Sequence, residues 1–221
     1  MQRRKVLIVD DHTLVLQGLA LLLSGQADLE VIALATSSED ALAELAERDI
    51  DVAVVDIGLG ASCGLALITK IRARWPAVRI LVVSAFCETL YAERALRSGA
   101  HGYLMKSAAA DALLQAVRKV LAGGVYFSAR VEEIFCARLS GTPGRNVTDP
   151  LAMLSDRQLE VLRLMGEGLG SSQIATAMNL SVKTIESHRG ALKAKLGAKS
   201  NTELIRIAVA WQQHGPASGN P

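Results

Sequence analysis

Four short apolar runs in the first half of the chain restrict what it can fold into. They cover residues 6–9, 52–55, 80–83 and 102–105, and apolar and polar residues do not alternate within them. Such runs, most of them rich in β-branched residues, are typical of strands buried on both faces of a parallel sheet. Because both faces of that sheet must be covered, the segments between the runs have to supply helices.

The segments between the runs have the pattern of amphipathic helices. A further strand is predicted over residues 30–35, and helices over residues 14–23, 37–48, 65–74, 90–97 and 108–121. Pro76 and Gly99 follow two of these segments, where helices commonly end. Five strands interleaved with five helices predict an α/β domain over residues 1–122, with the flavodoxin-like, doubly wound (βα)5 fold.

Polar side chains follow the carboxyl end of each run. Asp10 and Asp11 follow the first, Asp56 the second, Ser84 the third and Lys106 the fourth. These ends share one edge of an open parallel sheet, where ligands bind. Crowded carboxylates need a counter-charge, so we expect the three aspartates to bind Mg²⁺. Asp56 ends the central strand and is the expected nucleophile for a phosphoryl group, with Lys106 and Ser84 binding the phosphoryl oxygens.

Each of these residues, taken alone, could be an ordinary loop residue without a functional role, because Asp and Ser are common in the loops after strands. Their convergence at four strand ends favours the shared site. His12 resembles a metal ligand in position, but a solvated role is favoured because Mg²⁺ prefers oxygen. Cys63 and Cys87 lie near the predicted site without a neighbouring base, so we expect them to be spectators.

The three cysteines, Cys63, Cys87 and Cys136, are far apart and lack CxxC spacing. This argues against a disulfide framework or a zinc site and favours a reducing compartment. The N-terminus lacks the pattern of a signal peptide, and no apolar stretch reaches the length of a membrane span. We therefore expect a cytoplasmic protein without a membrane partner.

The second half of the chain has a purely helical pattern. Ser155 and Gln158 form a predicted capping box at the first helix, and short helices over 172–178 and 181–196 flank a turn at 179–180. A fourth helix is predicted from residue 201 or 202 to about 211. This pattern predicts an all-α, four-helix domain over 151–213 that contains a helix-turn-helix. We expect a linker over 123–150 and a disordered tail over 214–221.

Basic charge gathers on the third of these helices, although the whole chain has a net charge of only +2. One side of that helix is apolar and the other is basic and hydrogen-bonding, as a helix in a DNA major groove requires. Charge alone would equally suit a solvated surface. The residues predicted to contact DNA are Ser171, Ser172, Gln173, Lys183, Thr184, Glu186, Ser187, Arg189 and Lys193. Glu186 is unusual there, but it could accept a hydrogen bond from a cytosine amino group.

These motifs resemble those of two-component response regulators of the LuxR/FixJ/NarL family. Residues 5–122 resemble a receiver domain. The resemblance lies in Val9-Asp10-Asp11-His12, Asp56, Val83-Ser84-Ala85 and Gly102-Tyr103-Leu104-Met105-Lys106. Residues 154–211 resemble the LuxR-type DNA-binding domain at Leu154-Ser155-Asp156-Arg157-Gln158, Val182-Lys183-Thr184-Ile185 and Lys195-Leu196-Gly197.

The resemblance implies that a sensor histidine kinase phosphorylates Asp56. Ser84 then moves toward the phosphoryl group and Tyr103 follows inward, although Tyr103 has the alternative role of a half-buried core aromatic. It further implies a transcription regulator that binds double-stranded promoter DNA, forms a homodimer when phosphorylated or DNA-bound, and turns over no external substrate.

The segment after Asp56 departs from the family pattern. Gly60 stands where proline is common and Cys63 where an acidic residue is common, so the loop should be more flexible. The family resemblance therefore does not fix the lifetime of the phosphorylated state. A haloacid-dehalogenase-type phosphatase is the enzyme alternative, but it needs a second Asp two residues after the nucleophile, where Gly58 stands. A small-molecule sensor is the binding alternative, which the converging carboxylates disfavour.

Overall fold

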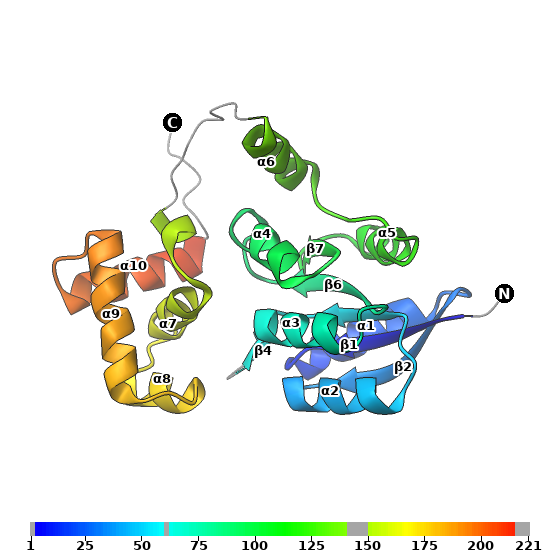
Figure 1. Ribbon diagram of the computed structural model, residues 1–221, viewed down its shortest axis with the longest axis horizontal. Coiled ribbons are helices and arrows are strands. Elements are labelled where there is room, and N and C mark those ends of the chain that lie inside the picture. Colours follow the sequence, from blue (N-terminus) through cyan, green and yellow to red (C-terminus); the bar gives the residue numbers. More distant parts are fainter. Residues whose placement is uncertain (1–2, 60–61, 141–149, 215–221) are drawn as a thin grey trace. The chain divides into compact units, whose positions relative to one another are not determined.

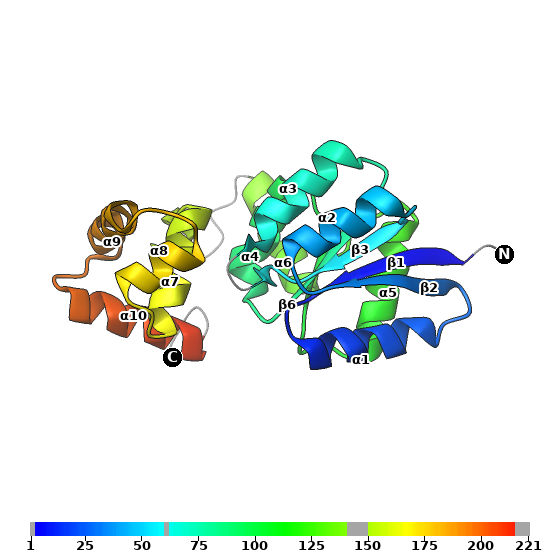
Figure 2. The same ribbon diagram turned by 90° about the horizontal axis from the view of Figure 1, so that it is seen from below.

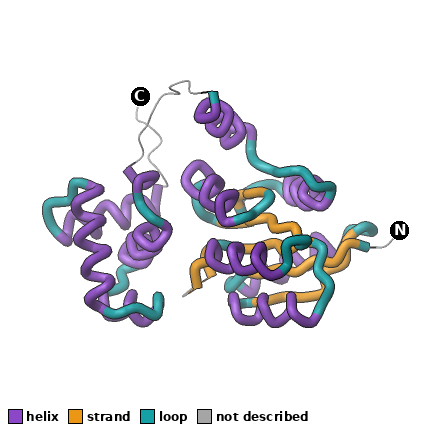
Figure 3. The backbone as a smooth tube through the Cα atoms, in the orientation of Figure 1, coloured by secondary structure: helices purple, strands orange, loops and turns teal. Residues whose placement is uncertain are grey.

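The computed structural model describes residues 3–59, 62–140 and 150–214. The chain divides into two compact units, Met1–Ser140 and Gly141–Pro221. Figure 3 shows that the described strands all belong to the first unit, whereas the described part of the second unit is built from helices.

A five-stranded parallel sheet forms the centre of the first unit (Figure 1). Its spatial order is β2-β1-β3-β6-β7, and its strands are β1 (Arg4–Val9), β2 (Leu29–Ala35), β3 (Val52–Val55), β6 (Arg79–Ser84) and β7 (Gly102–Met105). This is the flavodoxin-like order, in which the chain reverses its direction of travel between β1 and β3. The predicted fold class and all five predicted strands are confirmed.

Helices cover both faces of this sheet. They are α1 (Thr13–Ser24), α2 (Ser38–Glu47), α3 (Gly64–Arg74), α4 (Glu88–Ser98) and α5 (Ala110–Leu121). Figure 2 shows α1 on one face and α2 and α3 on the other. Alternate strand residues such as Val6, Ile8 and Val54 pack with Leu16 of α1 and Val117 of α5 in one buried cluster. This two-sided burial explains why the strand sequences are continuously apolar.

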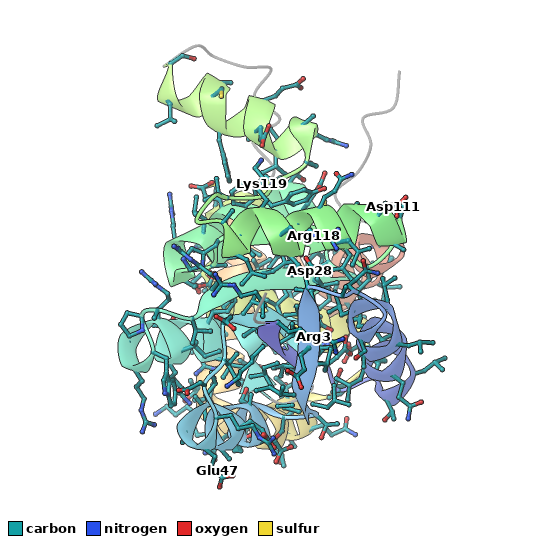
Figure 4. All side chains as sticks on the ribbon, turned by 90° about the vertical axis from the view of Figure 1, so that its right-hand side faces the viewer. Arg3, Asp28, Glu47, Asp111, Arg118 and Lys119 are labelled. Carbon is teal, nitrogen blue, oxygen red and sulfur yellow. The ribbon has the colours of Figure 1, made fainter. Side chains whose placement is uncertain are left out.

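One ion pair joins α5 to the turn before β2. Figure 4 shows Arg118 beside Asp28, and the guanidinium donates two hydrogen bonds of 2.8 Å to the carboxylate. The hydrogen bonds from Arg118 hold the pKa of Asp28 below its usual value. Both side chains are about half exposed, so the pair contributes little to stability.

A small hairpin follows β3 where the sequence predicts a loop. Its strands are β4 (Gly58–Leu59) and β5 (Ser62–Cys63), which pair antiparallel. Gly64 then starts α3, and a side chain there would place its Cβ 2.4 Å from Ile57 Cα, so the close return requires glycine. Residue Gly60 lies outside the described residues, as does the side chain of Cys63, so the expected flexibility of this loop stays a prediction.

The first part of the predicted linker over 123–150 belongs to the first unit. Tyr126 forms a parallel bridge with Gly102, and Tyr103 N donates to Tyr126 O at 2.9 Å. Helix α6 (Ala129–Leu139) follows and packs on α4. Residues 141–149 lie outside the described part of the chain.

The second unit begins with the 3₁₀ helix η1 (Pro150–Met153). It continues with α7 (Asp156–Gly166), α8 (Ser171–Ala177), α9 (Val182–Leu196) and α10 (Asn201–His214). The predicted capping box at Ser155 is present, and Ile174, Ile185 and Leu204 are fully buried where the helices meet. Helix α10 extends through His214, beyond the predicted end near 211. The rest of the predicted disordered tail lies outside the described residues.

Across the described residues, no helix combines the length and the apolar character that crossing a membrane demands.

Candidate functional site

The register of the central strands brings Asp10 and Asp56 together. Val9 and Val55 are partners across β1 and β3, so the next residue of each strand leaves the sheet at the same level. Asp56 N donates to Val9 O at 2.9 Å, which ties the two strand ends. Both carboxylates are buried, with only 1% of Asp10 and 4% of Asp56 exposed. The predicted convergence at this edge is therefore present for these two residues.

Lys106 supplies the positive charge between the two carboxylates. Its Nζ lies 2.6 Å from Asp10 Oδ2 and 2.6 Å from Asp56 Oδ2. Burial lowers the pKa of this ammonium, but the hydrogen bonds and charges of Asp10 and Asp56 outweigh that effect and raise the pKa above its usual value. Lys106 N also donates to Ser84 O at 2.7 Å, so β6 positions the residue that follows β7.

Backbone amides bind the other carboxylate oxygens. His12 N donates to Asp10 Oδ1 at 2.9 Å, and Gly58 N donates to Asp56 Oδ1 at 3.0 Å. Each carboxylate is therefore held between an amide and the Lys106 ammonium, which fixes its orientation. The contribution of Gly58 was missed by sequence reasoning, because a backbone amide leaves no residue-type signal.

The acidic cluster has the composition of a site for a hard divalent cation. Asp10, Asp11, His12 and Asp56 each offer a ligand atom, and these atoms all lie within 4.8 Å of one another. Among the described residues, the Lys106 ammonium pairs with two of the three clustered carboxylates, so a bound cation would balance the remaining negative charge. His12 is 67% exposed and its Nδ1 lies 2.8 Å from Asp11 Oδ1. The oxygen donors fit Mg²⁺, which prefers such ligands.

Ser84 and Tyr103 lie next to this cluster in the structure. Ser84 is buried, and its Oγ accepts a hydrogen bond from Phe86 N at 3.4 Å. Tyr103 is 1% exposed, and its hydroxyl donates to Phe86 O at 2.9 Å. Burial raises the pKa of Tyr103 well above its usual value, so the hydroxyl stays protonated and can donate. The ring therefore points inward in this structure and is more deeply buried than the half-buried alternative.

Phe86 is a second residue at this site, beside Gly58, that the sequence did not predict. Its carbonyl accepts from Tyr103, and its ring stacks on Tyr91 of α4 with centroids 5.1 Å apart. The role of Phe86 depends on its backbone as much as on its ring. Phe86 therefore connects Ser84, at the end of β6, with both Tyr103 and α4.

The residues predicted to contact DNA lie on α8 and α9 of the second unit. Exposed side chains among them are Ser172, Gln173, Lys183, Glu186 and Ser187, and partly buried ones are Ser171, Thr184, Arg189 and Lys193. Ser181 caps α9 by accepting from Thr184 N at 3.1 Å. Lys195 is engaged elsewhere, since its Nζ donates to Gln158 Oε1 and Met153 O at 2.9 Å each.

Arg189, one of the residues predicted to contact DNA, has a largely buried side chain. Only 11% of its side chain is exposed, and its Nη1 donates to Ser171 Oγ at 2.5 Å. Helical periodicity places Arg189 at the margin between the two faces of α9, and α8 covers that margin. The Ser171 hydroxyl on α8 is therefore close enough to accept a hydrogen bond from the guanidinium.

Two family models match the chain. The response regulator receiver domain matches residues 6–118, and the luxR family of bacterial regulatory proteins matches residues 152–208. The oxygen regulatory protein NreC of Staphylococcus aureus (strain JH9) is 35% identical over 209 residues, which cover 93% of this chain and 96% of that protein.

Solved structures give the same assignment across both units. RcsB from Salmonella enterica serovar Typhimurium, bound to promoter rprA in the presence of phosphomimetic BeF3⁻, has a TM-score of 0.71 at 26% identity, covering 94% of this chain and 99% of that one. A second RcsB structure from Salmonella typhimurium has a TM-score of 0.74 at 25% identity, covering 95% and 98%. A LuxR-family response regulator from Aurantimonas sp. SI85-9A1 has a TM-score of 0.59 at 27% identity, covering 63% and 99%.

Proposed function

The chain belongs to the response regulators that join a receiver domain to a LuxR-family DNA-binding domain, and on that premise we propose that phosphorylation of Asp56 controls its binding to promoter DNA. In this proposal the receiver lies within the first unit, Met1–Ser140, and the DNA-binding domain lies within the second, Gly141–Pro221. The observation that carries the proposal is the pair of buried carboxylates, Asp10 and Asp56, joined by Lys106.

Asp56 is the proposed nucleophile of the reaction. A carboxylate oxygen of Asp56 forms a bond to phosphorus, and the bond between phosphorus and the donor, a phosphohistidine of a sensor kinase, breaks. Lys106 stabilises the phosphoryl oxygens, because its ammonium already lies 2.6 Å from Asp56 Oδ2. Gly58 N fixes the other Asp56 oxygen, which limits the rotation of the carboxylate.

Asp10, Asp11 and Asp56 would hold the Mg²⁺ that this family's chemistry uses. When bound, the cation supplies positive charge to the phosphoryl oxygens. Asp10 is fixed for this role by His12 N, and Asp11 is more accessible, with 29% of its side chain exposed. His12 remains a solvated neighbour of Asp11 rather than a ligand in this proposal.

Ser84 and Tyr103 report the phosphorylated state in the proposed mechanism. The Ser84 hydroxyl donates a hydrogen bond to a phosphoryl oxygen, and this changes the conformation of the segment from Ser84 to Phe86. Because Phe86 O holds the Tyr103 hydroxyl and Phe86 stacks on α4, that change alters the surface formed by α4 and β7. Phosphorylation thereby shifts an equilibrium between two arrangements of the receiver.

The proposed partners are a sensor histidine kinase and double-stranded promoter DNA, which the chain meets in the cytoplasm. We place α9 in the major groove, with Lys183, Thr184, Ser187 and Lys193 toward the DNA and Ser172 and Gln173 of α8 toward the phosphate backbone. A homodimer then binds two half-sites. RcsB from Salmonella, which was solved bound to a promoter, supports the DNA partner by similarity.

Labelling by a small phosphodonor tests the phosphoacceptor. Acetyl phosphate with Mg²⁺ should add one phosphoryl group to the wild-type chain and none to Asp56→Asn, as measured by intact mass. Asp49→Asn is the matched control, because Asp49 is an exposed aspartate away from the cluster. Equal labelling of Asp56→Asn would refute the assignment, and continuous phosphate release in large excess over protein would favour the phosphatase alternative.

A further inference from the structure

Three polar side chains form a bridge between α8 and α9. The Ser171 hydroxyl donates to Glu186 Oε1 at 2.5 Å, and Arg189 Nη1 donates to Ser171 Oγ at 2.5 Å. Glu186 Oε1 and Arg189 Nη1 are 3.8 Å apart. One hydroxyl thus uses its proton for the carboxylate and a lone pair for the guanidinium. It ties both α9 residues to the first residue of α8.

The two charged members of this bridge differ in exposure. Arg189 is 11% exposed and its Nε is buried without an acceptor among the described residues, whereas 53% of Glu186 is exposed. A guanidinium turned into the protein in this way is held by Nη1 and is poorly placed to neutralise a DNA phosphate. Glu186 is the member that faces outward.

The chemistry of Glu186 selects what it can bind on DNA. Within the described residues, its hydrogen bond and ion pair both use Oε1, which leaves Oε2 as an accessible acceptor. An ionised carboxylate accepts but cannot donate, so it repels phosphates and pairs with donors on base edges. In the major groove, cytosine presents its N4 amino group, whereas adenine presents its N6 amino group beside the N7 acceptor, which repels a carboxylate.

Given the DNA binding proposed above, we propose that Ser171 and Arg189 are positioning residues that orient Glu186 to read a cytosine amino group. Ser171 fixes the Glu186 rotamer through Oε1, and Arg189 holds the Ser171 hydroxyl so that its proton points at Glu186. The bridge therefore determines specificity at one base pair in each half-site and adds little to general affinity.

Selection of duplexes from a randomised library tests this assignment with the full-length chain. The wild-type chain should select a cytosine at one position in each half-site. Glu186→Ala and Ser171→Ala should lose discrimination at that same position by roughly 5- to 150-fold in relative affinity. Ser171→Thr keeps the hydroxyl and should retain the preference. Glu186→Gln should shift it toward adenine, because an amide pairs with N6 and N7 together.

Salt dependence separates positioning from phosphate contact. Lys183→Gln, at an exposed lysine on the same helix, should lower the slope of log K against log salt by about one unit. Arg189→Gln should leave that slope unchanged while relaxing the cytosine preference. Unaltered base preference in Ser171→Ala, or a slope change in Arg189→Gln equal to that of Lys183→Gln, would overturn the assignment. If the wild-type chain selects no sequence at all, the proposed DNA binding itself has failed.

Discussion

Replacing Lys106 with methionine should destabilise the first unit strongly when Mg²⁺ is absent. The change removes the ammonium that lies 2.6 Å from both Asp10 Oδ2 and Asp56 Oδ2, while keeping most of the side-chain volume. Two carboxylates, 1% and 4% exposed and with oxygens within 4.8 Å of each other, are then left without the Lys106 counter-charge. Leaving a buried charge uncompensated costs about 3–5 kcal/mol, and we expect a loss of that size in the free energy of unfolding.

Mg²⁺ should recover much of this loss, because the cation replaces the missing positive charge between the carboxylates. At a concentration of about one hundred times its Kd, a ligand that binds the folded state alone contributes roughly 2.7 kcal/mol. In the wild-type protein, the raised pKa of Lys106 means that this residue stabilises the folded state. This stabilisation is fully present below the unfolded pKa of about 10.4 and is lost as the pH rises through the pKa of the folded state.

Urea unfolding followed by tryptophan fluorescence measures this effect in the full chain. The two tryptophans are Trp75 in the first unit and Trp211 in the second, so a Trp211→Phe background makes the emission report on the first unit. Lys70→Met, at an exposed lysine on α3, is the matched control and should change stability by less than about 0.5 kcal/mol. A loss of less than about 1 kcal/mol in Lys106→Met, with no response to Mg²⁺, would refute the reasoning.

Three further predictions concern metal binding, packing and acid stability. Asp11→Ala should weaken Mg²⁺ binding in a calorimetric titration, and unchanged affinity would remove Asp11 from the site. Gly102→Ala should destabilise the first unit by about 1–3 kcal/mol in urea unfolding, because the new Cβ would meet Tyr126 O at 2.8 Å; an unchanged midpoint would show that this segment yields freely. Asp28→Asn should remove at most about 1 kcal/mol from the free energy of unfolding, a contribution that is present above the unfolded pKa of about 3.9 and is lost as the pH falls through the lowered folded pKa. The stabilities of the wild-type protein and the variant should therefore converge in acid. A difference that stays constant down to low pH would contradict the pairing with Arg118.

The acidic site was predictable because parallel strands place their carboxyl ends at one edge. The positions of Asp10 and Asp56 followed from the apolar runs alone, since the register of β1 and β3 brings the residues after Val9 and Val55 together. Lys106 followed by the same geometry, because it comes directly after β7, two strands beyond β3 in the sheet. The fold was equally predictable, because doubly buried strands and amphipathic helices constrain the layers.

Other features depend on contacts that residue types do not encode. The two-residue strands of the β4–β5 hairpin are too short to carry a periodic pattern. The partner of Tyr103 is a backbone carbonyl, that of Phe86, which any residue could supply. Arg189 lies at the edge of the exposed face of α9, where a small change in helix rotation decides between solvent and the Ser171 hydroxyl.

The pairing of the segment after α5 with the sheet was also hidden from the sequence. A lone bridge between Tyr126 and Gly102 needs only one pair of backbone groups, and glycine at 102 permits the approach. The sequence predicted a linker over 123–150, because Gly123 and Gly124 end the preceding unit and residues 141–146 have the composition of an exposed linker, although residues 130–139 could form a helix. The aromatic residues Tyr126 and Phe127 were the available signal that this segment packs, because Phe127 is buried against Phe135 of α6.

A binding titration shows whether phosphorylation of Asp56 controls DNA binding, as proposed. The affinity of the full chain for a duplex selected from a randomised library is measured with and without acetyl phosphate and Mg²⁺, for the wild-type chain and for Asp56→Asn. We expect the phosphodonor to raise the affinity of the wild-type chain by about tenfold or more, a shift of roughly 1.4 kcal/mol, and to leave the affinity of Asp56→Asn unchanged. An equal response in both proteins, or no response in a wild-type chain that carries the phosphoryl group, would contradict it.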